Sequence, residues 1–121
     1  MSAPTSAPAR GQALRWAAFV LATGLQLVVL YWPRTPSEAS VPYLDKVIHF
    51  GVFALVVVAA VSAGLPRLPV FAVLALHAPV SELIQHYVLP DRDGSWPDAA
   101  ADLVGVAAGV LIVTFLRGRR R

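Results

Sequence analysis

Several charged and polar side chains of this sequence lie at the ends of long apolar runs, where they could bind a polar ligand or transfer a proton. A carboxylate in hydrocarbon is costly unless it loses its charge or finds a partner, so such residues usually face the protein interior and serve a function. The single imidazole among them titrates near neutral pH, which suits proton exchange. The candidate site residues are Asp45, Lys46, His49, Glu82, Gln85, Arg92, Asp98 and Asp102.

Helical spacing groups these residues into sets that share a face. Residues three or four positions apart are neighbours on an α-helix. The pairs with this spacing are Asp45 with His49, Glu82 with Gln85, and Asp98 with Asp102. The face of Asp102 continues with Gly105 and Gly109, and small residues at this spacing let membrane helices approach closely. We therefore expect the three sets to meet where three helices pack, with Gly105 and Gly109 as packing residues.

The composition indicates that a bilayer surrounds the elements that position these residues. Hydrophobic residues form 57% of the 121 residues and charged residues 14%, against about 25% charged in an average soluble domain. A helix needs roughly 17 to 25 apolar residues to span a bilayer. Runs of this length cover residues 14–32, 47–65, 70–89 and 99–116. Because backbone in lipid must be hydrogen-bonded within its own segment, the sequence predicts an all-α, polytopic, four-helix transmembrane bundle.

The positive charges predict an orientation and a domain organisation. Seven of the ten Lys and Arg residues fall at the end of the bundle that holds both termini, and basic residues are retained in the cytoplasm. We expect a disordered cytoplasmic N-terminus over residues 1–13, a transmembrane domain over 14–116 and a basic cytoplasmic tail over 117–121. The predicted location is the bacterial cytoplasmic membrane, with the polar residues on the extracytoplasmic side.

Other kinds of site are not predicted. With no cysteine in the chain, disulfides, thiolate nucleophiles and cysteine-bound zinc are excluded. The net charge of +3 sits at the ends of apolar runs, so nucleic acid is not an expected partner. Imidazole and carboxylate are metal ligands, but the sequence has no H-E-x-x-H or comparable local ligand pair. We therefore expect no metal and no other cofactor.

Four short motifs in this order resemble the VanZ-like membrane proteins. They are D-K-x-x-H-F at residues 45–50, S-E-x-x-Q at 81–85, P-x-R ahead of D-x-x-x-D at 90–102, and G-x-x-x-G at 105–109. The resemblance covers roughly residues 30–116. It implies a small helical integral membrane protein, and the founding member of the family is associated with lowered susceptibility to the glycopeptide teicoplanin. One departure is Asp102, which stands where the family usually has asparagine and adds an acid to the cluster.

Two functions follow from these observations. The first is a non-enzymatic binding or accessory protein that holds a membrane lipid, a cell-wall precursor or an amphiphilic antibiotic through Lys46, Arg92 and the buried acids. The second is a membrane enzyme in which Glu82, Asp98 or His49 transfers a proton on a lipid-linked substrate. A structural role, in which Glu82 and His49 only hold helices together, is also open. A proton-coupled transporter is disfavoured because four helices leave little room for an alternating path.

Overall fold

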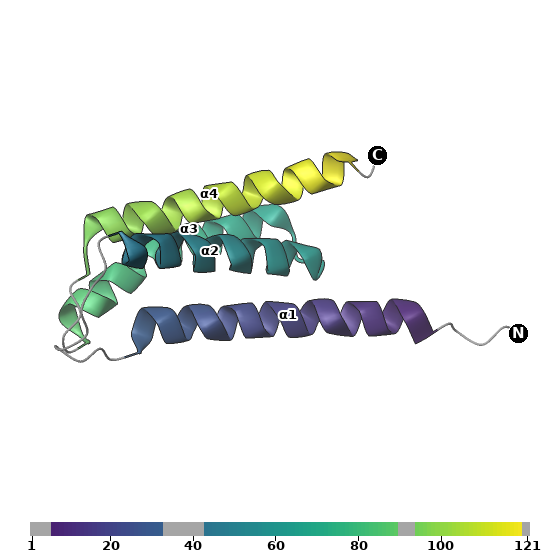
Figure 1. The fold of residues 1–121 in the computed structure, drawn as a ribbon, viewed down its shortest axis with the longest axis horizontal. Coiled ribbons are helices and arrows are strands. Elements are labelled where there is room, and N and C mark those ends of the chain that lie inside the picture. Colours follow the sequence, from purple (N-terminus) through teal and green to yellow (C-terminus); the bar gives the residue numbers. More distant parts are fainter. Residues whose placement is uncertain (1–5, 33–42, 90–93, 120–121) are drawn as a thin grey trace, which may run out of the picture.

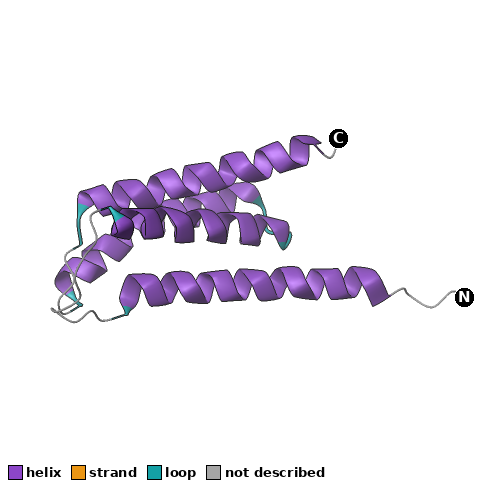
Figure 2. Cartoon of the chain, viewed as in Figure 1, coloured by secondary structure: helices purple, strands orange, loops and turns teal. Residues whose placement is uncertain are grey.

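The computed structural model is all-helical and describes residues 6–32, 43–89 and 94–119 of the chain (Figures 1 and 2). Its helices are α1 (Ser6–Tyr31), α2 (Leu44–Ser62), α3 (Arg67–Tyr87) and α4 (Trp96–Arg119). Within the described ranges, these four helices are each long and apolar enough to cross a membrane. The predicted all-α class is confirmed, and the four long apolar helices indicate a multi-pass membrane protein.

Helix α2 is the centre of the bundle. It packs most extensively against α4 and also contacts α1 and α3, while α3 packs on α4 (Figure 1). The core side chains come from all four helices and include Leu30, Phe53, Val57, Leu74, Ala78 and Val106. Large apolar residues such as Leu21, Val73 and Leu111 are exposed on the outside. An apolar surface of this kind requires an apolar surrounding, which agrees with the membrane expected from the sequence.

A tight turn connects α2 to α3 at the end of the bundle that holds both chain ends. The Leu65 N–H donates to the Ala60 carbonyl at 3.1 Å, and Gly64 has a φ of 109°. A glycine in the left-handed region satisfies the last carbonyls of a helix without steric strain. Pro66 follows in an extended conformation and is the N-cap residue of α3, which begins at Arg67.

Helix α1 begins at Ser6 rather than near residue 14, so residues 6–13, which the sequence analysis assigned to a disordered segment, are helical. The side-chain amide of Gln12 donates to the Ala63 carbonyl at 2.7 Å and fixes this part of α1 to the end of α2. Alanine, arginine and glutamine favour a helix without being strongly apolar. A search for apolar runs therefore places the start of this helix too late.

Polar contacts also hold α1 at its other end. The Gln85 amide nitrogen of α3 donates to the Leu30 carbonyl at 2.8 Å, and the Tyr31 hydroxyl lies 2.7 Å from His77 Nε2. The last carbonyls of a helix have no partner within it. Gln85 therefore satisfies a buried group that would otherwise be unpaired in an apolar environment.

Replacing Gln85 with leucine is expected to lower the free energy of unfolding by about 1–3 kcal/mol, because the Leu30 carbonyl is left buried without a donor. The measurement is an SDS titration in mixed micelles followed by circular dichroism. Gln26→Leu is the matched control: both side chains are buried, but the Gln26 amide nitrogen has no hydrogen-bond partner among the described residues. Equal losses for the two variants would contradict the role given to Gln85.

Candidate functional site

The predicted polar residues meet at the end of the bundle away from the two termini. This end holds the first turns of α2, the last turns of α3 and the first turns of α4 (Figure 1). We define the polar cluster as the six residues that lie together there: Asp45, Lys46, His49, Glu82, Asp98 and Asp102. Helices that alternate in direction bring these segments to one level, as the sequence analysis expected.

A buried triad of His49, Glu82 and Asp102 forms the interior of the polar cluster. The His49 Nδ1 lies 2.7 Å from Asp102 Oδ1 and 3.5 Å from Glu82 Oε1. The exposed fractions of the three side chains are 1%, 7% and 0% for His49, Glu82 and Asp102. Each residue comes from a different helix. When Asp102 is ionised it can only accept, so Nδ1 of His49 donates the proton of this hydrogen bond.

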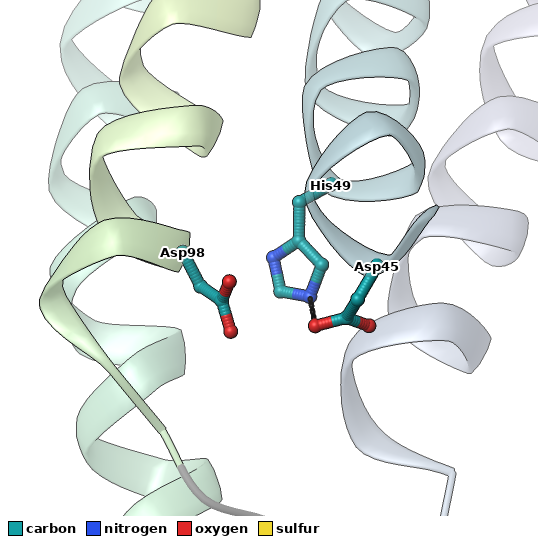
Figure 3. A group of neighbouring side chains, drawn as sticks. All are labelled: Asp45, His49 and Asp98. Atoms are coloured by element: carbon teal, nitrogen blue, oxygen red, sulfur yellow. Dashed lines mark ion pairs between the residues drawn. The ribbon is translucent and has the colours of Figure 1, made fainter. Parts of the chain in front are cut away.

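The opposite nitrogen of His49 faces the outer part of the polar cluster. Figure 3 shows the imidazole between Asp45, one turn earlier on α2, and Asp98 on α4. The distance from His49 Nε2 to Asp45 Oδ2 is 3.8 Å. Lys46 Nζ lies 3.3 Å from Asp98 Oδ1. Lys46, expected to be available to a ligand, is therefore paired with an acid of the cluster.

The residues before α4 fix the position of Glu82. The Ser95 N–H donates to Glu82 Oε2 at 3.0 Å, and Ser95 Oγ accepts from the Asp98 N–H at 3.3 Å. Ser95 thus caps α4 and orients a carboxylate of α3. A Cβ at Gly94 would overlap the backbone carbonyl of Glu82, so only glycine allows this close approach. Sequence analysis missed Ser95, although the S-x-x-D pattern of residues 95–98 is similar to a capping box.

Gly105 and Gly109 bring α4 against α2. A Cβ at Gly105 would overlap the Phe50 carbonyl, and a Cβ at Gly109 would lie 2.7 Å from Val57 Cβ. Phe50 follows His49 directly, and Asp102 lies one turn before Gly105. The close approach of the two helices is therefore what allows the His49–Asp102 hydrogen bond.

Two predicted site residues are not part of the polar cluster that the structure describes. Gln85 donates to Leu30 and belongs to the contact between α3 and α1. Arg92 lies outside the described residues. Of the remaining histidines, His77 contacts the Tyr31 hydroxyl and the Phe53 ring. His86 is exposed and lies edge-on to Tyr87.

The buried triad retains unused hydrogen-bonding capacity. Within the described part of the chain, His49 Nε2, Glu82 Oε1 and Asp102 Oδ2 are buried and have no hydrogen-bond partner. Buried polar atoms are nearly always paired, and those that are not point to strain, catalysis, water or a bound ion. The arrangement can hold a proton, a cation or a hydrogen-bond donor of a ligand.

A cavity beside the triad opens between α3 and the start of α4. Its volume is about 350 Å³, and Glu82 and Ser95 lie next to Leu83, Tyr87 and Trp96 in its wall. A carboxylate is thus combined with apolar and aromatic side chains in a single space. Ligand pockets have this composition: mostly apolar walls with few polar groups that set the orientation.

No protein family model, curated protein or solved structure matches this chain. The resemblance to VanZ-like proteins stays a prediction that depends on the four motifs.

Proposed function

We propose that this protein sits in the bacterial cytoplasmic membrane and binds the polar head of an amphiphile, such as an envelope lipid, a cell-wall precursor or an amphiphilic antibiotic. The observation that carries this proposal is the cavity in which Glu82 lies beside Leu83, Tyr87 and Trp96. The apolar wall suits an acyl chain, and the carboxylate suits a group that donates hydrogen bonds.

The charges of the polar cluster favour a head that carries an ammonium group over a head with no positive charge. The carboxylates are Asp45, Glu82, Asp98 and Asp102, and the basic groups are Lys46 and His49. Because Lys46 is paired with Asp98, Glu82 is the residue of the cluster that lines the cavity, and His86 lies in the same wall. An anionic head would be repelled there, whereas an amine would gain a charge-assisted hydrogen bond.

The distribution of basic residues supports an extracytoplasmic position of the polar cluster. Arg15 and Arg117 line one cavity at the end of the bundle that holds the termini, and Arg67 donates to Thr114 Oγ1 at 3.2 Å near the same end. Basic residues are retained on the cytoplasmic side. The polar cluster would then face the envelope, where lipids and cell-wall precursors are exposed. The resemblance to VanZ-like proteins adds an accessory role in antibiotic susceptibility to this proposal.

Glu82→Gln is expected to weaken binding of an amine-headed lipid about tenfold or more, because a charge-assisted hydrogen bond contributes roughly 1.5–3 kcal/mol. The measurement is native mass spectrometry of the detergent-purified protein titrated with phosphatidylethanolamine and, in parallel, phosphatidylglycerol. Trp96→Ala should also weaken binding, since Trp96 lines the cavity outside the polar cluster. Arg67→Gln, at the opposite end of the bundle, is the control. Equal affinity for the two lipids in the unmodified protein would contradict the proposal.

A membrane enzyme is the second candidate function. The observation that favours it is the His49 ring, which Asp102 holds at Nδ1 while Glu82 Oε1 lies 3.5 Å from the same nitrogen. An oriented imidazole beside a carboxylate can act as a general acid and base. Turnover of a lipid-linked substrate that disappears in Glu82→Gln while binding persists would favour the enzyme. Loss of binding in the same variant favours the binding protein.

A further inference from the structure

We propose that His49, Glu82 and Asp102 form a binding site for one divalent transition-metal ion. One ligand atom from each of the three residues lies within 4.8 Å of the other two. The Nδ1 of His49 is 2.7 Å from Asp102 Oδ1 and 3.5 Å from Glu82 Oε1. Ligand atoms that bind zinc tetrahedrally at roughly 2.0–2.2 Å are about 3.4 Å apart. The distances from His49 to the two carboxylates are within about 1 Å of this spacing, and all three donors lie within 4.8 Å of one another.

The unpaired carboxylate oxygens provide independent support. Glu82 Oε1 and Asp102 Oδ2 are buried without a hydrogen-bond partner in the described residues, on side chains that are 7% and 0% exposed. Both side chains are directed at the same His49 nitrogen. Carboxylate oxygens in an apolar interior are unfavourable unless something pairs with them. A cation between the three residues would pair with both.

The surroundings of the triad match those of metal ligands. Ligating carboxylates and histidines are usually held by a further hydrogen-bonding group on their second atom. Glu82 Oε2 accepts the Ser95 N–H at 3.0 Å, and His49 Nε2 faces Asp45 Oδ2 at 3.8 Å. Ser95 therefore orients one of the ligands from outside the triad.

Charge and ligand type narrow the identity of the ion. Two carboxylates and a divalent cation sum to zero charge, which suits a site within the span of three membrane helices. The Lys46 ammonium is paired with Asp98, which lies outside the triad. One imidazole with two carboxylates suits zinc, manganese or iron(II) better than magnesium or calcium. Three protein ligands would leave a position open for water or a ligand.

This site goes beyond the proposed function and does not depend on it. The sequence does not predict a metal, because it has no H-E-x-x-H or comparable local ligand pair. The three ligands come from α2, α3 and α4, and only the packing of these helices brings them together. A metal would lie beside the Glu82 cavity, where its open position could face the head of a bound amphiphile.

The test is metal binding by the purified full chain in detergent. After removal of metal with a chelator, titration with zinc in competition with a chromophoric indicator is expected to show one ion per chain, and mass spectrometry should detect the same stoichiometry. Asp102→Asn and Glu82→Gln should each weaken zinc binding at least tenfold, since each removes a charged ligand atom of the triad. The matched control is Asp98→Asn, which removes a buried carboxylate of the polar cluster outside the triad and should change the affinity less than twofold.

A second measurement, the unfolding temperature with and without zinc, can also be made on variants of low stability. Zinc should raise the unfolding temperature of the unmodified protein, because a ligand that binds only the folded state stabilises it. The same addition should leave Asp102→Asn unchanged. Absence of stoichiometric zinc binding by the folded, unmodified protein would overturn the proposal. So would an Asp98→Asn loss larger than that of Asp102→Asn, since the ion would then lie between Asp45, His49 and Asp98. Lipid binding is also measured on the metal-free protein. A protein that binds lipid but no zinc contradicts only the metal site, and a protein that binds zinc but no lipid contradicts only the proposed function.

Discussion

Replacement of His49 by leucine is expected to lower the free energy of unfolding by about 3–5 kcal/mol, because removal of one partner of a buried polar pair leaves the other uncompensated. Asp102 would lose the donor at 2.7 Å, and Glu82 would lose the nitrogen at 3.5 Å. Both carboxylates are buried, so water cannot replace the imidazole. An SDS titration in mixed micelles, followed by far-ultraviolet circular dichroism, measures the loss.

Two further variants show whether the loss comes from the buried pair. His86→Leu removes an exposed histidine from α3 and should change the free energy by less than about 0.5 kcal/mol. The double variant His49→Leu with Asp102→Leu should recover part of the stability, since an apolar pair of similar volume can replace a buried ionic pair, while Glu82 remains without the imidazole. A double variant as unstable as His49→Leu alone would show that the uncompensated Asp102 carboxylate does not cause the loss.

The spans could be predicted from the sequence because hydrophobic length is a property of a single segment. A run of about 20 apolar residues is enough to identify a spanning helix, whatever its neighbours do. In the described residues, four helices are long and apolar enough to cross a membrane. The start of α1 at Ser6 could not be found in this way. Its first turns contain weakly apolar helix formers, and the contact of Gln12 with Ala63 depends on tertiary packing.

The sequence was enough to predict the end of the bundle at which the candidate site lies and some of its residues. The i, i+4 spacing placed Asp45 with His49 and Asp98 with Asp102, and the alternating helix directions brought both sets to the end of α3. The partner of Gln85 was not predictable. It lies three residues after Glu82, about 60° away around the helix, and this rotation is enough to direct it to Leu30 of α1. Which neighbour a side chain meets depends on the rotation and tilt of each helix, which sequence spacing does not define.

Gly105→Ala is expected to lower the free energy of unfolding by about 1–3 kcal/mol and to weaken zinc binding as well, because overpacking forces the backbone to shift. The added Cβ would overlap the Phe50 carbonyl of α2, and a backbone atom cannot rotate away as a side chain can. Helix α4 must therefore move from α2. The measurements are the SDS titration and the zinc titration, made on the same preparation.

Gly51→Ala is the matched control on the adjacent helix, because a Cβ at Gly51 meets no atom within 4 Å. It should be neutral or stabilising by up to about 1 kcal/mol, since alanine favours a helix over glycine. His49 and Asp102 flank the contact of Phe50 with Gly105, so separating the two backbones there also lengthens the 2.7 Å hydrogen bond of the triad. If Gly105→Ala lowers stability but leaves zinc affinity unchanged, the triad does not depend on this close approach.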